Sequence, residues 1–255
     1  RQMCIRDSLW KVSMDFTAAL NFSSETAEPQ IGVPKIIRDA RHLFGIHPLE
    51  DAQTLLLNDR GFLLTHAPSS VLDWSDPAEV RDTHYEEARL LAQRLLPDFD
   101  IKPINSHTYR NESIKEHYWL DGIQYGPCVE FVHNDYADTL SSDQKTIEKS
   151  FAQIMGMPTD KRVIGINIWR SVSDDPLERL PLAVCDRPSI YPNDLRYSLN
   201  PEAPKPFNYH SCMTNDEQRW FYYSRQTIEE ALVFTTYDSH PEAVSYTHLT
   251  LPTKA

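Results

Sequence analysis

The feature that most constrains the fold of this chain is a series of short apolar segments with the character of β-strands. The clearest is Arg162-Val-Ile-Gly-Ile-Asn-Ile-Trp169, a β-branched run typical of a buried strand. Three more are Leu182–Cys185, Trp220–Tyr223 and Ala231–Tyr237, and loops rich in Pro, Asn and Asp separate them without a repeat at fixed period. Together they predict a mainly β domain.

Earlier segments add strands and a helical flank. The stretch Val33–Arg41 leads into a Leu-rich segment, and Asn58-Asp-Arg-Gly61 supplies a turn before Phe62–Thr65, a pattern that predicts strand, turn, strand. From Asp76-Pro77 to Pro97 the apolar residues recur at three and four positions, which predicts a helix.

The middle of the chain continues this alternation of strand and helix. Ile101–Tyr109 has an extended pattern, and Cys128–His133 alternates in the manner of a half-buried strand that ends at polar residues. Ser142–Met155 is a second candidate helix. Many short strands with helices early in the chain indicate a jelly roll with a helical flank.

Composition excludes several classes of function. A chain of 255 residues with 40% hydrophobic content fits one domain. Its net charge of −12, without a basic stripe, argues against nucleic acid as a partner. The apolar runs fall far below the roughly 20 residues that a membrane span needs, so no membrane partner is expected. Four scattered cysteines indicate reduced thiols and a cytoplasmic location.

Both ends of the chain look foreign to the rest. Residues 1–8 and 244–255 resemble translated sequencing-adapter strings, and we exclude them from reasoning about the fold. We therefore expect a non-native leader, a single domain over residues 9–243 and a non-native tail, so that the domain is truncated at its C-terminal end.

The residues that carry chemistry begin with His133-Asn-Asp135. Two residues apart in an extended segment, the imidazole and the carboxylate lie on one face and are close enough to share a metal ion. Two His and one carboxylate form the facial triad of non-haem iron(II) oxygenases, which leaves positions open for a keto acid and O₂. The pair alone is weak evidence, because a chance His-x-Asp on a solvated strand end is common.

The surrounding motifs make the pair more specific. In order along the chain they are Arg110, His133-Asn-Asp135, Asn167-Ile-Trp-Arg170, Pro181-Leu-Ala-Val-Cys-Asp186, Arg219-Trp-Phe-Tyr-Tyr223 and Tyr237-Asp-Ser239. This series resembles the AsaB-type hydroxylase/desaturase family, whose relatives include a CmcJ-like protein of the cephamycin pathway and the gibberellin desaturase group. The resemblance runs from about Lys35 to Ser239.

The resemblance implies a double-stranded β-helix, cupin-like, that holds Fe(II) and uses 2-oxoglutarate and O₂ to hydroxylate or desaturate a small metabolite. It implies His133 and Asp135 as iron ligands. The family places its distal His, and an Arg for the keto acid, after the element that ends at Ser239. We expect both to be missing: His240 comes too early, and His248 lies within the foreign string, where we regard its position as accidental.

Further residues are candidates for binding cosubstrate or substrate, each with a structural alternative. Asn167 and Arg170 flank Trp169, which is itself expected in the core, and Arg170 equally fits a structural ion pair. Tyr109 and Arg110 precede the metal segment, and the Arg110 guanidinium suits either a substrate carboxylate or a salt bridge. Asp186 and Asp238 lack a His two residues before them and are expected in turns or beside the site.

Two other classes of function remain open at this point. A non-catalytic cupin-like binding protein would keep the barrel without turnover. A zinc hydrolase would need three protein ligands and an activated water. The aromatic run Trp220–Tyr223 fits a stacking platform, but such density is more often part of the core.

Overall fold

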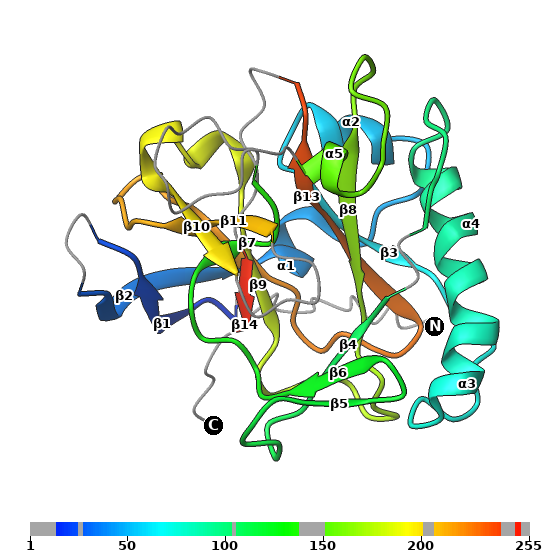
Figure 1. Cartoon of the computed structure of the whole chain (residues 1–255). Helices are drawn as coiled ribbons and strands as arrows, with labels where there is room; N and C mark the ends of the chain where they lie inside the picture. The colour runs from blue at the N-terminus through cyan, green and yellow to red at the C-terminus, as the bar shows by residue number, and fades with distance from the viewer. Residues whose placement is uncertain are drawn as a thin grey trace, which may run out of the picture.

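The structure, a computed structural model, describes residues 14–24, 28–103, 106–137, 151–200, 207–240 and 248–250. Within these residues the strands form one large sheet and two small ones (Figure 1). The eight-stranded sheet has the order β1 (Phe16–Phe22), β2 (Gln30–Asp39), β12 (Trp220–Tyr222), β9 (Leu182–Cys185), β14 (His248–Thr250), β7 (His133–Asn134), β11 (Phe207–Cys212) and β10 (Leu195–Asn200). The three-stranded sheets have the orders β3 (Phe62–His66), β13 (Glu230–Asp238), β8 (Ile164–Trp169) and β4 (Thr108–Arg110), β6 (Ile123–Gly126), β5 (Tyr118–Leu120).

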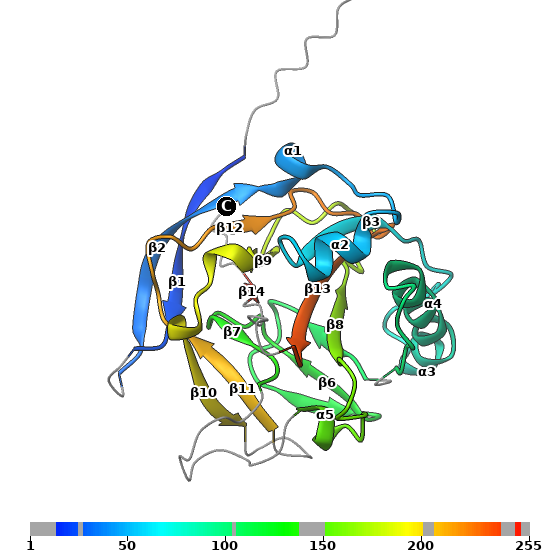
Figure 2. The same ribbon diagram turned by 90° about the horizontal axis from the view of Figure 1, so that it is seen from above.

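The large sheet and the β3–β13–β8 sheet bury one core between them. Val184 and Phe221 of the large sheet pack with Phe62, Leu232 and Phe234 of the small one. Figure 2 shows the large sheet curling round on one side, with β13 and β8 on the other. Because each sheet has an apolar face that must leave water, this pairing is the stable arrangement. The mainly β prediction with flanking helices is confirmed.

The aromatic run belongs to this core. Trp220, Phe221, Tyr222 and Tyr223 are all buried, with exposed fractions of 1%, 3%, 6% and 1%. Alternate residues along a strand face opposite sides, so Phe221 and Tyr223 join the core between the sheets, and Trp220 and Tyr222 join a cluster on the other side of β12. The prediction that these rings are core is confirmed.

The large sheet also closes upon itself through β1, its edge strand. Isolated bridges join Asn21 to Phe131 and Ser23 to Met213. The Val132 amide donates to the Asn21 carbonyl at 2.9 Å, and Leu20 and Phe22 pack in one cluster with Val132. The strand nearest the N-terminus therefore fixes the backbone immediately before His133.

The helical flank covers the outer side of β8 and β13. α3 (Pro77–Glu79), a π-helical turn (Val80–His84) and α4 (Tyr85–Leu95) form the predicted helix, which begins at the Asp76 cap. Leu91 and Leu95 pack against Ile166 and Ile168 of β8. The helix expected over 142–155 lies largely outside the described residues, which contain only its end as α5 (Phe151–Ile154).

Two predicted strands are wrong in part. The Leu-rich segment before the Asn58 turn is a helix, α2 (Ala52–Leu57), which follows the short helix α1 (Ala40–Phe44). Ala52 and Leu56 are four residues apart and both fully buried, a helical spacing that the apolar composition obscures. The expected strand Cys128–His133 pairs as a ladder only from His133, because Phe131 makes just an isolated bridge to Asn21 of β1.

Two short 3₁₀ turns lead from β9 to β10: Arg187–Ser189 and Pro192–Asp194. Of the described helices, none has the length and apolarity to cross a membrane. The described cysteines, Cys128, Cys185 and Cys212, form no disulfide.

Candidate metal centre

His133 is oriented by a hydrogen bond to the backbone of its own segment. Its Nδ1 lies 2.8 Å from the Phe131 carbonyl oxygen. A carbonyl only accepts, so Nδ1 must carry the hydrogen, and Nε2 is then the ring nitrogen with a lone pair in the neutral imidazole. Such a bond from the far nitrogen is the usual device that fixes a metal-binding histidine. Nε2 faces Asp135, with 3.4 Å between Nε2 and Oδ1.

Asp135 is oriented from the opposite sheet. Asn167 of β8 donates from Nδ2 to Asp135 Oδ2 at 2.6 Å, while Oδ1 is the oxygen nearest His133. The His133 and Asp135 side chains retain 20% and 25% of their exposure, so the site is enclosed yet reachable. Two atoms that each bind a metal ion at about 2.1 Å and at right angles lie about 3 Å apart, so the observed separation fits a shared ion.

The local charges favour a cation between these two groups. Burial opposes the imidazolium form of His133, but the hydrogen bond and charge of Asp135 and the Phe131 carbonyl outweigh it, so the pKa of His133 lies above its ordinary value. The space between Nε2 and the carboxylate therefore favours a positive charge. The residues present fit a metal that prefers imidazole and carboxylate, such as Fe(II).

The sheet register places the backbone of His248 beside His133. In β14, His248 pairs with His133 on one side and with Val184 on the other. Ser211 of β11 pairs with His133 from its other side. Among the side chains that the structure describes, no group of three His, Cys, Asp or Glu gathers that would hold a metal ion.

Of the other predicted site residues, Arg110 lies towards the metal centre, whereas Tyr109 and Arg170 make other contacts. Arg110 of β4 interacts with the centre through its charge. Burial lowers the pKa of Arg110, and the charge of Asp135 opposes this shift in part. The charge of Arg110 also opposes, in small part, the raised pKa of His133. Tyr109, next to it, packs instead on Tyr125, with 5.5 Å between ring centroids.

The side chain of Arg170 does not join His133 and Asp135 at the metal centre. Its guanidinium donates to the carbonyls of Ala67 and Ile228 and lies 5.4 Å from the Trp74 ring centroid. Burial is the main cause that lowers its pKa, opposed by the charge of Glu87 on the helical flank. Arg170 directly follows β8, three residues after Asn167, so the two side chains face opposite sides of the chain.

Asp186 and Asp238, which the sequence analysis rejected as metal ligands, both form ion pairs. Asp186 pairs with Arg219 at 2.8 Å, and Asp238 pairs with Arg162 at 2.6 Å. Sequence reasoning missed the Phe131 carbonyl, which orients His133, and the strand β11, which pairs with His133 through Ser211. No sequence signal marks a backbone carbonyl, and β11 lacks the β-branched residues that would have revealed the strand.

Comparison with known proteins agrees with this architecture. Residues 15–254 match the model of a family described as YDMC, an oxidoreductase/YMDC permease-like domain, and the chain belongs to that family. Over 172 residues it is 26% identical to the Fe(II)/2-oxoglutarate-dependent dioxygenase NvfI of Aspergillus novofumigatus. That alignment covers 64% of this chain and 56% of the relative, so it spans little more than half of the relative's length.

Two solved structures share the fold. One of the iron and alpha-ketoglutarate-dependent endoperoxidase NvfI has a TM-score of 0.63 at 17% identity and covers 96% of this chain and 91% of its own. A second structure of the endoperoxidase has a TM-score of 0.62 at 17% identity, with coverage of 94% and 91%. The jelly-roll prediction is confirmed at the level of the fold.

Proposed function

We propose that this chain is an iron(II)/2-oxoglutarate-dependent oxygenase that acts on a small molecule, with His133 and Asp135 as two protein ligands of the iron. The observation that carries the proposal is the pair of atoms, His133 Nε2 and Asp135 Oδ1, aimed at one another while Phe131 and Asn167 hold their far sides. The names of the curated relative and of the similar structures support the same cofactor and cosubstrate.

Bound iron with 2-oxoglutarate and O₂ would supply the oxidising power for hydroxylation or desaturation of the substrate, with succinate and CO₂ as the other products. The protein's part would be to hold and orient these groups. His133 and Asp135 would hold the iron, and the remaining positions would be open to the keto acid and O₂. Membership of the AsaB-type hydroxylases and desaturases, a role in secondary metabolism and a cytoplasmic location belong to this proposal.

The direct test is turnover of the cosubstrate. Purified protein loaded anaerobically with Fe(II) is exposed to O₂ and 2-oxoglutarate, and succinate is measured. Succinate that requires both Fe(II) and O₂ supports the proposal. Iron binding without succinate would favour a non-catalytic cupin-like protein, and ester or amide hydrolysis that depends on zinc and ignores 2-oxoglutarate would favour a hydrolase.

Asn167 is the residue that positions Asp135, and its removal is expected to weaken the centre. In Asn167→Leu the carboxylate loses its donor at Oδ2 and gains freedom to turn, which should lower iron affinity about 10–100-fold. Equilibrium dialysis with Fe(II) measures the change. Asn167→Gln keeps an amide and should recover part of the affinity, whereas a fold defect would affect both variants alike.

A further inference from the structure

The β4–β6–β5 sheet carries an unusual group of exposed apolar side chains. All three residues of β5, Tyr118, Trp119 and Leu120, are large, and their exposed fractions are 48%, 56% and 51%. A run of three such residues on one short strand is more than the scattered apolar exposure of an ordinary surface. In Figure 1 this sheet lies at one end of the molecule, beneath the larger sheets.

One face of this sheet combines a cation with an aromatic ring. Gly126 of β6 pairs with Arg110 of β4, and a Cβ at Gly126 would lie 2.7 Å from Arg110 Nη1 and against the His117 ring. Arg110 and His117 therefore lie over the glycine. Trp119 pairs with Gln124, two residues before Gly126, so its side chain faces the same side.

Arg110 links this face to the proposed metal centre, because its charge interacts with both proposed ligands. The charge of Asp135 acts on Arg110, and the charge of Arg110 acts on His133. The guanidinium contacts His117 Nδ1 at 3.3 Å and the Pro127 carbonyl at 3.4 Å. Within the described residues no carboxylate lies within ion-pair distance of it, so the salt bridge considered from the sequence is not observed there.

The opposite face is occupied and anchored. Tyr118 stacks on Tyr125 with ring centroids 5.1 Å apart and planes at 4°, and Tyr125 in turn contacts Tyr109. Arg81, from the π-helical turn, donates to the Asp121 carbonyl at the tip of the β5–β6 hairpin at 3.2 Å. The stack and this bond hold the hairpin in place, so the Trp119 side is the face that remains for a ligand.

We propose that this face selects the substrate of the oxygenase, and that the substrate is a small molecule with an apolar ring system and a carboxylate roughly 10 Å apart, the spacing of two strands in a sheet. Arg110 binds the carboxylate, and the ring packs on Trp119. The inference rests on the proposed function. Charge complementarity supports it, because Arg110 places a cation on this face and no carboxylate among the described residues pairs with it.

The test uses biphenyl-4-carboxylate and its neutral isostere biphenyl-4-carboxamide, which share shape but differ in charge. Binding is measured by equilibrium dialysis under argon, both without metal and with Mn(II), so no turnover is needed. We expect the acid to bind about tenfold tighter than the amide, because an ionised acceptor strengthens the bond to Arg110. Arg110→Gln should remove that preference, and Trp119→Ala should weaken both probes several-fold.

Matched variants lie in the same sheet. Lys115→Gln removes a cation from the loop between β4 and β5 and should keep the preference for the acid. Leu120→Ala removes an equally exposed apolar side chain from the other face and should leave both affinities near those of the parent. Circular dichroism checks that every variant is folded.

Three outcomes would overturn the inference: equal binding of acid and amide by the parent, an acid preference that survives Arg110→Gln, or displacement of the acid by 2-oxoglutarate. The last would assign Arg110 to the keto acid. Because the assay contains no iron or O₂, its result is independent of succinate release. The proposed function can fail while binding selectivity stands, and the reverse.

Discussion

Replacing His133 with alanine is expected to abolish iron binding in the micromolar range while the fold is kept. The imidazole is held by the Phe131 carbonyl so that Nε2 meets Asp135. Loss of a group that merely orients a ligand costs about 10–100-fold in metal affinity, so loss of the ligand itself should exceed about 100-fold. Asp135→Ala should behave in the same way. Anaerobic dialysis with Fe(II) gives the affinities.

A surface histidine provides the control for this measurement. His66 is exposed at the end of β3, and His66→Ala removes an imidazole without touching the centre. It should bind iron as the parent does. If His133→Ala and His66→Ala bind iron equally well, the metal site lies elsewhere and the assignment of both ligands fails.

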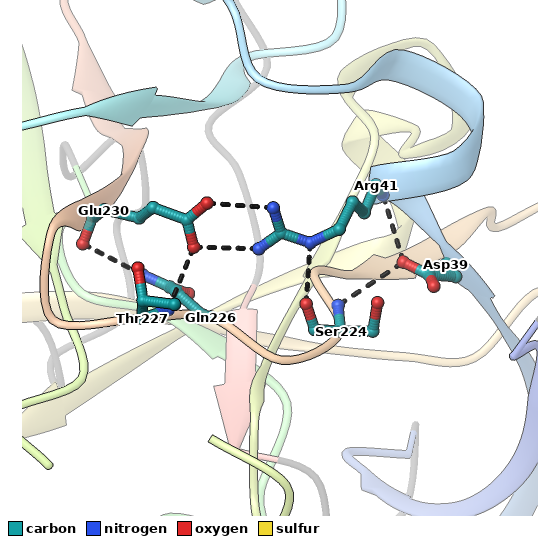
Figure 3. Close-up of polar contacts among 6 residues, drawn as sticks. All are labelled: Asp39, Arg41, Ser224, Gln226, Thr227 and Glu230. Atoms are coloured by element: carbon teal, nitrogen blue, oxygen red, sulfur yellow. Dashed lines mark hydrogen bonds and ion pairs between the residues drawn. The ribbon is translucent and has the colours of Figure 1, made fainter. Parts of the chain in front are cut away.

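The second large effect concerns the ion pair between Arg41 in α1 and buried Glu230 at the start of β13 (Figure 3). Arg41 Nη1 and Nη2 donate to the two Glu230 oxygens at 2.8 Å each, and Nε donates to the Ser224 carbonyl. Removing one partner leaves a buried charge. Arg41→Met should therefore destabilise the fold by about 3 kcal/mol, measured by urea unfolding.

The network around this pair makes the loss hard to repair. Asp39 accepts from the amides of Arg41 and Ser224, and Glu230 also accepts from the Thr227 amide. An exposed bidentate pair, Arg89 with Glu86, is the matched control, and Arg89→Met should change stability little because water screens it. If Arg41→Met and Arg89→Met lowered the free energy of unfolding by similar amounts, then bidentate geometry rather than burial would determine the stabilisation.

The same pair predicts a pH dependence. Burial raises the pKa of Glu230, but hydrogen bonds from Arg41 and Thr227 outweigh this, so its pKa lies below the ordinary value of 4.5. A carboxyl whose pKa is depressed by folding contributes stability that is present above 4.5 and is lost as the pH falls through the folded value. In Glu230→Gln the free energy of unfolding should therefore fall less steeply as the pH is lowered into the acid range than it does in the parent.

Sequence patterns succeeded where one local rule decides the outcome. The β-branched run of β8 forms the predicted strand, and the aromatic rings of β12 are buried, which is the commoner outcome for such a run. His133 and Asp135 share a face because they are two apart in an extended segment, and the structure brings their side chains together.

The parts of the fold and of the site that the sequence did not predict depend on contacts between residues far apart in the chain. β10 and β11 contain polar residues and no β-branched ones, so their pairing reflects neighbours rather than propensity. Asn167 reaches Asp135 from a different sheet, which no spacing rule predicts. Arg170 looked equivalent to Asn167 because β8 is covered on both sides, so its sequence does not tell the inner face from the outer.

The bridge between β1 and the segment before His133 has a consequence for how the protein assembles. Asn21 and Val132 meet only after a long stretch of chain has been ordered, and contacts of such sequence separation form slowly because loop closure costs entropy first. We therefore expect the metal centre to form late in folding. Metal binding in a refolding experiment would report completion of the barrel rather than its onset.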